Sequence, residues 1–291
     1  NQNCINMHPA VLAKIDYQSI YNYVYFHMVP GARTVYEGQS RLGPGQYLEF
    51  VDGKARLGAY WNNSFQEQDS AEFSQLKEQF FHALRSGVRD SAAGAANSGA
   101  FLSGGTDSST VAGLLPEQQG SPAHTYSIGF SAQGYDEMDY ARIAVRHFNT
   151  DHHEYYVTAD DIVKAVPAIA AIYDQPFGNS SAVPTYFCAK LAREDGCDRI
   201  LGGDGGDELF GGNDRYAKQR VFEHYHMLPG LLRSALIEPA SALLPDAVTP
   251  LRKLRRYVEQ ARIPMPRRLE TYNLLERFGA EHVFEGDFLH A

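Results

Sequence analysis

Residues 101–109, FLSGGTDSS, join the end of an apolar strand to the start of an apolar helix through two adjacent glycines. Gly104 and Gly105 allow positive φ and let the backbone approach a ligand without a clash from Cβ. Free amides in such a turn, the serine hydroxyls and the positive end of the helix dipole all favour a bound anion. We expect the helix to cover residues 108–115 and to end at Pro116. The stretch therefore predicts a strand, a phosphate-sized loop and a helix, the unit from which parallel α/β sheets are built.

The loop carries an acidic residue where the common phosphate-binding loop carries a basic one. In the GxxxxGKS/T loop of nucleoside triphosphatases, lysine reaches the terminal phosphates. Residues 101–109 contain no lysine and have Asp107 instead. A carboxylate beside a phosphate is repulsive unless a cation lies between them, and Mg²⁺ binds through one or two carboxylates together with phosphate oxygens. The loop therefore predicts a magnesium-nucleotide site.

Residues 200–212, ILGGDGGDELFGG, form a second loop that follows an apolar strand. Six glycines and three acidic residues fill these thirteen positions, which is more than a plain surface turn needs. Carboxylates crowded on one flexible loop repel one another unless a metal ion or hydrogen-bond donors lie nearby. The composition of this second loop therefore predicts a bound cation.

Both loops resemble the motifs of known families. The first resembles the SGGxDS pyrophosphate loop of the ATP-pyrophosphatase superfamily, whose members cleave ATP to AMP and pyrophosphate while adenylating an acceptor. The second resembles the loop ending in DExFGG of glutamine-hydrolysing asparagine synthetases and their amidotransferase relatives, and it follows the first by about a hundred residues, in the expected order. The similarity includes YDEMDYAR at residues 135–142 and the segments 150–154 and 174–186, and it runs from about residue 16 to the end.

The resemblance implies ATP and Mg²⁺ as cofactors and assigns roles to residues of both loops. Backbone groups of Leu102 and Ile128 would recognise adenine. Asp107 and Asp207 would bind magnesium, and Asp204 matches the acidic residue associated with formation of the acyl-adenylate. The implied ATP-binding residues are Leu102, Ser103, Gly104, Gly105, Asp107, Ser108, Ile128, Gly202 and Gly203.

The implied reaction is the ATP-dependent amidation of aspartate to asparagine through β-aspartyl-AMP, with release of AMP and pyrophosphate. Ammonia would come from glutamine through a glutaminase domain of the whole protein. The acceptor is less well defined, because residues 179–182, NSSA, stand before Pro184 where some asparagine synthetases have threonine and arginine. No cation in this segment would bind the α-carboxylate of aspartate. The alternative is therefore an amidotransferase of the same family that acts on another carboxylate.

Two further alternatives come from other functional classes. An RNA-modifying pyrophosphatase of the thiolation type needs a catalytic cysteine and a basic surface, and the sequence indicates neither. A non-catalytic, nucleotide-binding fragment is the second alternative. Cys4 is preceded by three residues, so it does not match the N-terminal cysteine of a glutaminase, and the matched region stops before a lysine-bearing helical region of the family. We therefore expect the chain to bind ATP weakly, to hydrolyse no glutamine and to be poorly active alone.

The order of the elements predicts an α/β fold with a parallel sheet, helices on both faces and a helical C-terminal part. Strands are expected at residues 124–130 and 152–157, and helices from residue 136, from a cap at Asp160 to Tyr173, and over residues 184–194. Such alternation builds a parallel sheet, and ligands bind such sheets at the carboxyl ends of the strands. Both loops would lie at that edge.

The N-terminal region resembles a connector, at residues 1–65, between a glutaminase domain and a synthetase domain at residues 66–291 that is truncated at its C-terminus. Asp16 is expected to cap a helix that runs through Phe26, and residues 46–51 to form a strand. A further helix would begin at Asp69 and place an apolar stripe in the core, made of Phe73, Leu76, Phe80, Leu84 and Val88.

Composition sets wider bounds on the function. The net charge of −9 argues against nucleic-acid binding, and we interpret the basic run at residues 252–256 as a solvated helix face. The three cysteines show no metal-ligand or disulfide spacing. His152 and His153 would point to opposite faces of a strand, so the pair is not expected to bind one metal ion. The sequence shows no signal peptide or membrane span, so we expect a cytoplasmic protein with small-molecule substrates, and we leave open whether it forms a homodimer.

Overall fold

The computed structural model describes residues 2–65, 71–130, 137–212, 214–245, 248–265, 267–270 and 273–290. The chain forms two compact units, Asn1–Asp204 and Gly205–Ala291. Across the described ranges, no helix has the length and apolar character needed to cross a bilayer.

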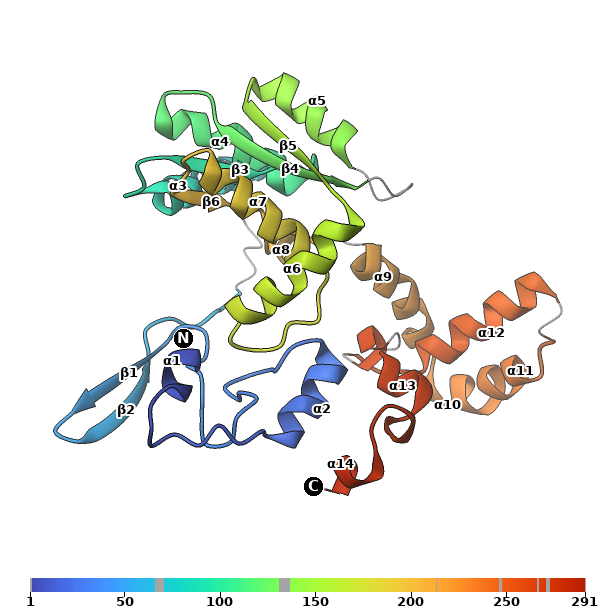
Figure 1. Cartoon of the computed structure of the whole chain (residues 1–291). Helices are drawn as coiled ribbons and strands as arrows, with labels where there is room; N and C mark the ends of the chain where they lie inside the picture. The colour runs from blue at the N-terminus through green and yellow to red at the C-terminus, as the bar shows by residue number, and fades with distance from the viewer. Residues whose placement is uncertain are drawn as a thin grey trace. The chain divides into compact units, whose positions relative to one another are not determined.

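The N-terminal part of the first unit contains two helices and a hairpin. The helices are α1 (Gln2–Asn6) and α2 (Tyr17–Phe26), and the antiparallel hairpin is formed by β1 (Gln46–Val51) and β2 (Lys54–Ala59) (Figure 1). The carboxylate of Asp16 accepts a hydrogen bond of 3.1 Å from the amide of Gln18, which satisfies one of the free donors at the start of α2. The predicted cap and the predicted strand 46–51 are therefore confirmed.

The rest of the first unit is built on a four-stranded parallel sheet. Its strands are β3 (Ser98–Phe101), β4 (His124–Phe130), β5 (Asp151–Val157) and β6 (Arg199–Leu201), in the order β5-β4-β3-β6. The predicted α/β fold is confirmed, and β4 has the predicted bounds. Because β3 lies in the middle of the sheet, residues 101–109 leave it next to β4 on one side and β6 on the other.

Helices cover both faces of this sheet (Figure 1). One face packs on α3 (Phe73–Ala92), α4 (Thr106–Gln119) and α5 (Met138–Phe148), in a cluster that includes Ala100, Leu102, Leu115 and Met138. The other face packs on α6 (Ala159–Ile172) and α7 (Ala182–Glu194). Side chains alternate along a strand, so Phe101, between Ala100 and Leu102, packs in the second layer with Tyr126.

Two helix ends differ from the sequence-based predictions. The helix α4 begins at Thr106 and continues past Pro116 to Gln119, so the predicted stop at Pro116 is wrong; α4 ends instead at Gly120, which has a φ of 69° and donates to the carbonyl of Pro116. The cap of α6 is Thr158 and not Asp160, because Thr158 and Asp161 form a reciprocal capping box.

The apolar stripe of α3 is only partly in the core. Val88 is buried and Leu84 packs beside it, whereas Phe73 is 80% exposed. Twenty residues of helix extend about 30 Å, but β3 and β6 have four and three residues and span only about 10–13 Å. The sheet is thus too short to cover the whole stripe. The predicted helix start at Asp69 and the acid Asp136 lie outside the described residues.

The second unit is helical, as predicted for the C-terminal part. Its elements are α8 (Gly206–Phe210), α9 (Asp214–His226), α10 (Gly230–Leu232), a π-helical turn (Arg233–Ile237), α11 (Glu238–Ala242), α12 (Thr249–Ala261), α13 (Leu274–Phe278), α14 (Gly286–His290) and two 3₁₀ turns (Arg267–Glu270, Ala280–His282). The basic run 252–256 lies on α12, where Arg252, Lys253 and Arg256 are exposed. The interpretation of this run as a solvated helix face is confirmed.

Candidate active site

The first loop turns on Gly104 at the carboxyl end of β3. Its φ is 81°, a conformation that costs other residues energy. A Cβ on Gly104 would also overlap the backbone of Tyr140 and Ala141, at the start of α5. Both the conformation and the close packing therefore require glycine here.

An ion pair links α5 to β5. Arg142 comes from the motif at residues 135–142, and its guanidinium donates hydrogen bonds of 2.9 Å and 2.6 Å to the two carboxylate oxygens of Glu154. These bonds hold the pKa of Glu154 below its usual value. The ion pair joins α5 to β5 and so supports the backbone that packs against Gly104.

Serine hydroxyls close the same loop. The hydroxyl of Ser108 accepts a hydrogen bond of 3.2 Å from the amide of Ser103, and it lies 3.0 Å from the Ser103 hydroxyl. The amide of Gly105 donates to the Ser103 hydroxyl over 3.3 Å. These contacts draw the loop around the first turn of α4, where free helix amides and hydroxyls lie together. Such a cradle suits the oxygens of a phosphate group.

Residues 202–204 of the second loop belong to the first unit, where Gly203 contacts the first loop. A Cβ on Gly203 would lie 2.8 Å from the carbonyl carbon of Asp107 and from the amide nitrogen of Ser108, so Gly203 permits the two loops to touch. Asp204 is exposed, and its carboxylate lies beside Gly202. The structure therefore brings together the predicted residues 102–108 and 202–204.

The two predicted magnesium ligands belong to different units. Asp107 lies in the first turn of α4 and is half-buried, and its carboxylate has no hydrogen-bond or ion-pair partner among the described residues of the first unit. Asp207 lies in the first turn of α8 in the second unit, with its carboxylate against Gly212. A carboxylate without a protein partner at the positive end of a helix is available to a cation bound with phosphate.

Leu102 and Ile128, whose backbone groups were predicted to recognise adenine, differ in how many of these groups are free to bind a ligand. The amide of Leu102 donates to the carbonyl of Tyr126 over 3.0 Å, and the Leu102 carbonyl accepts from the Ser127 hydroxyl. Leu102 thus keeps only a second lone pair on its carbonyl oxygen for a ligand. Ile128 follows Tyr126 by two residues, so its backbone groups also point towards the β3 side, where β3 has already ended at Phe101.

A cavity of about 640 Å³ borders the segment expected to define the acceptor. It lies between the N-terminal part and the connection from α6 to α7, and Tyr23, Tyr36, Phe177 and Asn179 contribute to its lining. Asp174 is the one charged residue among the described lining residues. None of the predicted ATP-binding residues lines this cavity.

The structure also brings together side chains that the sequence did not predict as a group. His124, His153 and Asp195 each offer one ligand atom within 4.8 Å of the others. His152 points to the opposite face of the sheet, where its Nδ1 lies 2.9 Å from the Thr125 hydroxyl, so the prediction that the adjacent histidines diverge is confirmed. The missed signal is the parallel register of β4 and β5, which sets His124 opposite Asp151.

Comparison with known proteins matches residues 79–286 to the family model of asparagine synthase. A provisionally named glutamine-hydrolyzing asparagine synthetase 2 of Methanocaldococcus jannaschii is 34% identical over 221 residues, covering 75% of this chain and 42% of the relative. The glutamine-hydrolyzing asparagine synthetase 1 of Bacillus subtilis is 28% identical over 264 residues, covering 86% of this chain and 40% of the relative. Among solved structures, NMN synthetase from Francisella tularensis aligns over 69% of this chain and 92% of its own, with a TM-score of 0.37 and 16% identity.

The chain spans about two fifths of the length of these two curated relatives. The family model covers most of the chain, including both loops and the sheet between them. The chain therefore belongs to the asparagine synthase family.

Proposed function

We propose that the chain binds magnesium-ATP on its first loop and transfers AMP to a carboxylate, with aspartate as the acceptor, before ammonia converts the acyl-adenylate into an amide. The observation that carries this proposal is the contact between the two loops, in which Gly203 lies against the first turn of α4 beside Asp107. This contact supports the proposal because it brings residues 202–204 of the acidic loop to the carboxyl edge of the sheet that carries residues 103–108, and ligands of parallel α/β folds bind at that edge.

The pyrophosphate part of ATP is assigned to the cradle of residues 103–108. The amides in the first turn of α4 have no carbonyl partner within the helix, and the side chains of Ser103 and Ser108 are exposed and half-exposed. Hydrogen bonds to charged phosphate oxygens are stronger than those between neutral groups. The backbone groups of Ile128, which point past the end of β3, are suited to the adenine edge.

Magnesium fits the donor set of this site, because carboxylate oxygens are the ligands it prefers in proteins. Asp107, whose carboxylate has no hydrogen-bond or ion-pair partner among the described residues of the first unit, would hold the ion, and the assignment of Asp207 to the same ion rests on the sequence motif alone. When bound, magnesium would neutralise the negative charge that develops on the leaving pyrophosphate. The Asp107 side chain is not part of the hydrophobic core, so its assigned role is to bind the ion and orient the phosphates.

The reaction balances in two steps. An oxygen of the acceptor carboxylate attacks the α-phosphorus of ATP, a new P–O bond forms, and the bond to pyrophosphate breaks. Ammonia then attacks the acyl carbon, AMP leaves with the former carboxylate oxygen, and the ammonia nitrogen loses a proton. Positioning and electrostatic stabilisation supply most of the rate in such transfers. Asp204, exposed beside Gly202, is assigned to the adenylation step.

The acceptor has one specific alternative. Residues 179–182 carry no cation, and the only charge in the lining of the neighbouring cavity, among described residues, is the carboxylate of Asp174. A second anionic group on the acceptor, such as the α-carboxylate of aspartate, gains no ion pair from these residues. This absence of a cation is the reason to test carboxylates other than aspartate as acceptors.

We also assign to the whole protein a glutaminase domain as the source of ammonia and a cytoplasmic location.

Formation of labelled AMP tests the proposal. The chain is incubated with ATP, Mg²⁺, ammonium and a panel of ¹⁸O-carboxylates that includes aspartate, and AMP is examined by mass spectrometry. A productive acceptor should transfer one ¹⁸O to AMP. Asp204→Asn should lower AMP formation at least about 100-fold, whereas Asp160→Asn, an exposed acid in the first turn of α6, should leave it unchanged.

Each other outcome separates the alternatives. AMP labelled only from a carboxylate other than aspartate would identify the other acceptor. Saturable ATP binding with no AMP from any carboxylate, over incubations long enough to detect a poorly active chain, would favour the non-catalytic alternative. Formation of ADP and phosphate in place of AMP would contradict the proposal.

A further inference from the structure

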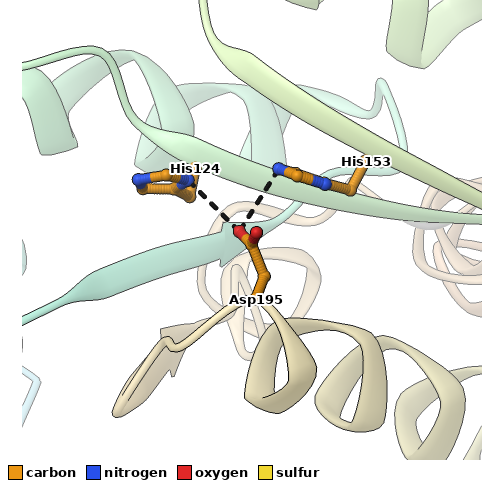
Figure 2. A group of neighbouring side chains, drawn as sticks. All are labelled: His124, His153 and Asp195. Carbon is orange, nitrogen blue, oxygen red and sulfur yellow. Dashed lines mark ion pairs between the residues drawn. The ribbon is translucent and has the colours of Figure 1, made fainter.

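Two histidines and an aspartate converge at the amino-terminal edge of the sheet, opposite the edge that carries the two loops. His124 is the first residue of β4 and His153 the third of β5; the register pairs His153 with Tyr126, two residues after His124, so both histidines lie on the same face. Asp195 ends α7, the helix that packs on β4 and β5. Figure 2 shows both rings directed at the Asp195 carboxylate.

The distances between the ligand atoms match a metal site. His124 Nδ1 and His153 Nε2 lie 3.4 Å and 3.2 Å from the same oxygen, Asp195 Oδ2. Zinc binds imidazole nitrogen and carboxylate oxygen at about 2.0–2.1 Å, so the edges of its tetrahedron are about 3.3 Å long. Two of the three edges therefore already have the length found in a tetrahedral site, and all three ligand atoms lie within 4.8 Å of one another.

Among the described residues, the two ring nitrogens make ion pairs with Asp151 and Asp195 but no hydrogen bond. His124 Nδ1 and His153 Nε2 are shielded from solvent, and neither makes a hydrogen bond to another described residue. Asp195 Oδ2 already accepts a hydrogen bond of 2.7 Å from the hydroxyl of Tyr126. Buried polar atoms are normally paired, and unpaired ones call for an explanation such as an ion.

Asp151 provides a fourth group at the same point. Its carboxylate oxygens lie 3.4 Å from His124 Nδ1 and 3.8 Å from His153 Nε2, and its side chain is 60% exposed, so it can turn inward. We propose that His124, His153 and Asp195, with Asp151 as the fourth ligand, bind one zinc ion that ties β4 and β5 to the end of α7. Nothing in this site is shared with the ATP-binding residues.

The donor set selects the kind of metal. Imidazole nitrogens suit zinc and other late divalent transition metals, whereas magnesium and calcium prefer sites made wholly of oxygen. Four protein ligands in a tetrahedron form a closed site, which is typical of structural zinc.

Outer contacts hold the ligands in place. The Tyr126 side chain is fully buried; its hydroxyl donates to Asp195, and its ring stacks on that of His153 with a centroid distance of 5.2 Å. Partners of this kind orient metal ligands, and their loss commonly weakens metal binding 10- to 100-fold. Tyr126 is therefore a positioning residue of the proposed site.

Calorimetric titration with ZnCl₂ alone tests the proposal on the metal-free chain, in buffer that contains excess Mg²⁺. The wild type should bind one equivalent, with a dissociation constant on the order of 1 µM or tighter. His124→Gln and His153→Gln should each weaken binding by more than about 100-fold, and Tyr126→Phe by about tenfold or more. His147→Gln, an exposed histidine on α5, is the matched control and should bind as the wild type does.

X-ray absorption of the zinc-loaded wild type gives a reading that does not depend on the folding of variants. It should show only nitrogen and oxygen ligands, two of them imidazoles. Absence of saturable zinc binding would overturn the proposal, as would sulfur in the coordination shell or wild-type affinity in both folded histidine variants. The first of these outcomes would leave the histidines as ion-pair partners of Asp151 and Asp195.

Discussion

The two edges of the parallel sheet carry different chemistry. At the carboxyl edge, residues 103–108 and 202–204 offer amides, hydroxyls and carboxylates, which suit phosphate and magnesium. At the amino edge, His124 and His153 offer imidazole nitrogens beside Asp195, which suit zinc. One sheet therefore carries two proposed sites that differ in the cation their donors prefer, and we expect that each can be disturbed without the other.

The edges also differ in what fixes their geometry. The carboxyl edge depends on the backbone, because Gly104 needs positive φ and Gly203 needs close approach to α4. The amino edge depends on side chains held by strand register, with α7 packed over them. Backbone substitutions should therefore damage the first site and spare the second.

The largest effect is expected from Gly104→Ala. The new Cβ would overlap the backbone of Tyr140 and Ala141, in addition to the strain of positive φ. Gly120→Ala has a similar φ of 69° but nothing within 4 Å, so it isolates the strain alone. Urea unfolding should show that Gly104→Ala costs about 2 kcal/mol more than Gly120→Ala.

The same pair of variants compares the two edges. Gly104→Ala should lose ATP binding, measured by calorimetry, while zinc binding at the amino edge remains. Equal stability of the two variants would contradict the close packing of α5 against Gly104.

A smaller effect is expected from Ser108→Ala. It removes a hydroxyl that contacts the Ser103 amide and hydroxyl, and with it one donor to phosphate. Loss of one charge-assisted hydrogen bond should weaken magnesium-ATP binding about tenfold. Ser109→Ala, the next position of α4, is the control and should change binding less than about twofold. If both variants behave alike, the Ser108 hydroxyl is not part of the cradle.

The smallest effect concerns the thiols behind the amino edge. Burial raises the pKa of Cys188 to about 12 and also raises that of Cys197, whereas Cys4 is exposed. At pH 8 the thiolate fraction of Cys188 is on the order of 10⁻⁴. Iodoacetamide should therefore label Cys4 in the folded chain and all three thiols in urea, as read by mass spectrometry. Zinc should not change this pattern, and labelling of Cys188 or Cys197 in the folded chain would contradict their burial.

Local signals explain why much of the fold could be predicted. Strand 124–130 is rich in β-branched and aromatic residues, and Asp16 stands directly before an aromatic helix, so both were predicted correctly. The end of α4 was missed because Gly120, in the left-handed conformation, terminates it in place of Pro116. The stripe of α3 was overestimated because periodicity gives the face of a helix and not the length of its partner.

The proposed zinc site shows a second limit of sequence reasoning. His153 was considered only with its neighbour His152, and adjacent residues of a strand do diverge. His124, His153 and Asp195 come from three separate elements, and only strand order and register bring them together. Contiguous motifs such as residues 101–109, in contrast, keep their chemistry within one turn of chain.

The most direct test of the central claim is calorimetric titration of ATP, with and without Mg²⁺, into the wild type, Asp107→Asn and Asp160→Asn. Asp107 lies at the start of α4 and its carboxylate has no partner among the described residues of its unit, whereas Asp160 is an exposed acid at the start of α6. The wild type and Asp160→Asn should bind ATP at least about tenfold more tightly with Mg²⁺, and Asp107→Asn should lose most of that gain. An equal gain from Mg²⁺ in Asp107→Asn would contradict a magnesium-bridged phosphate site on this loop.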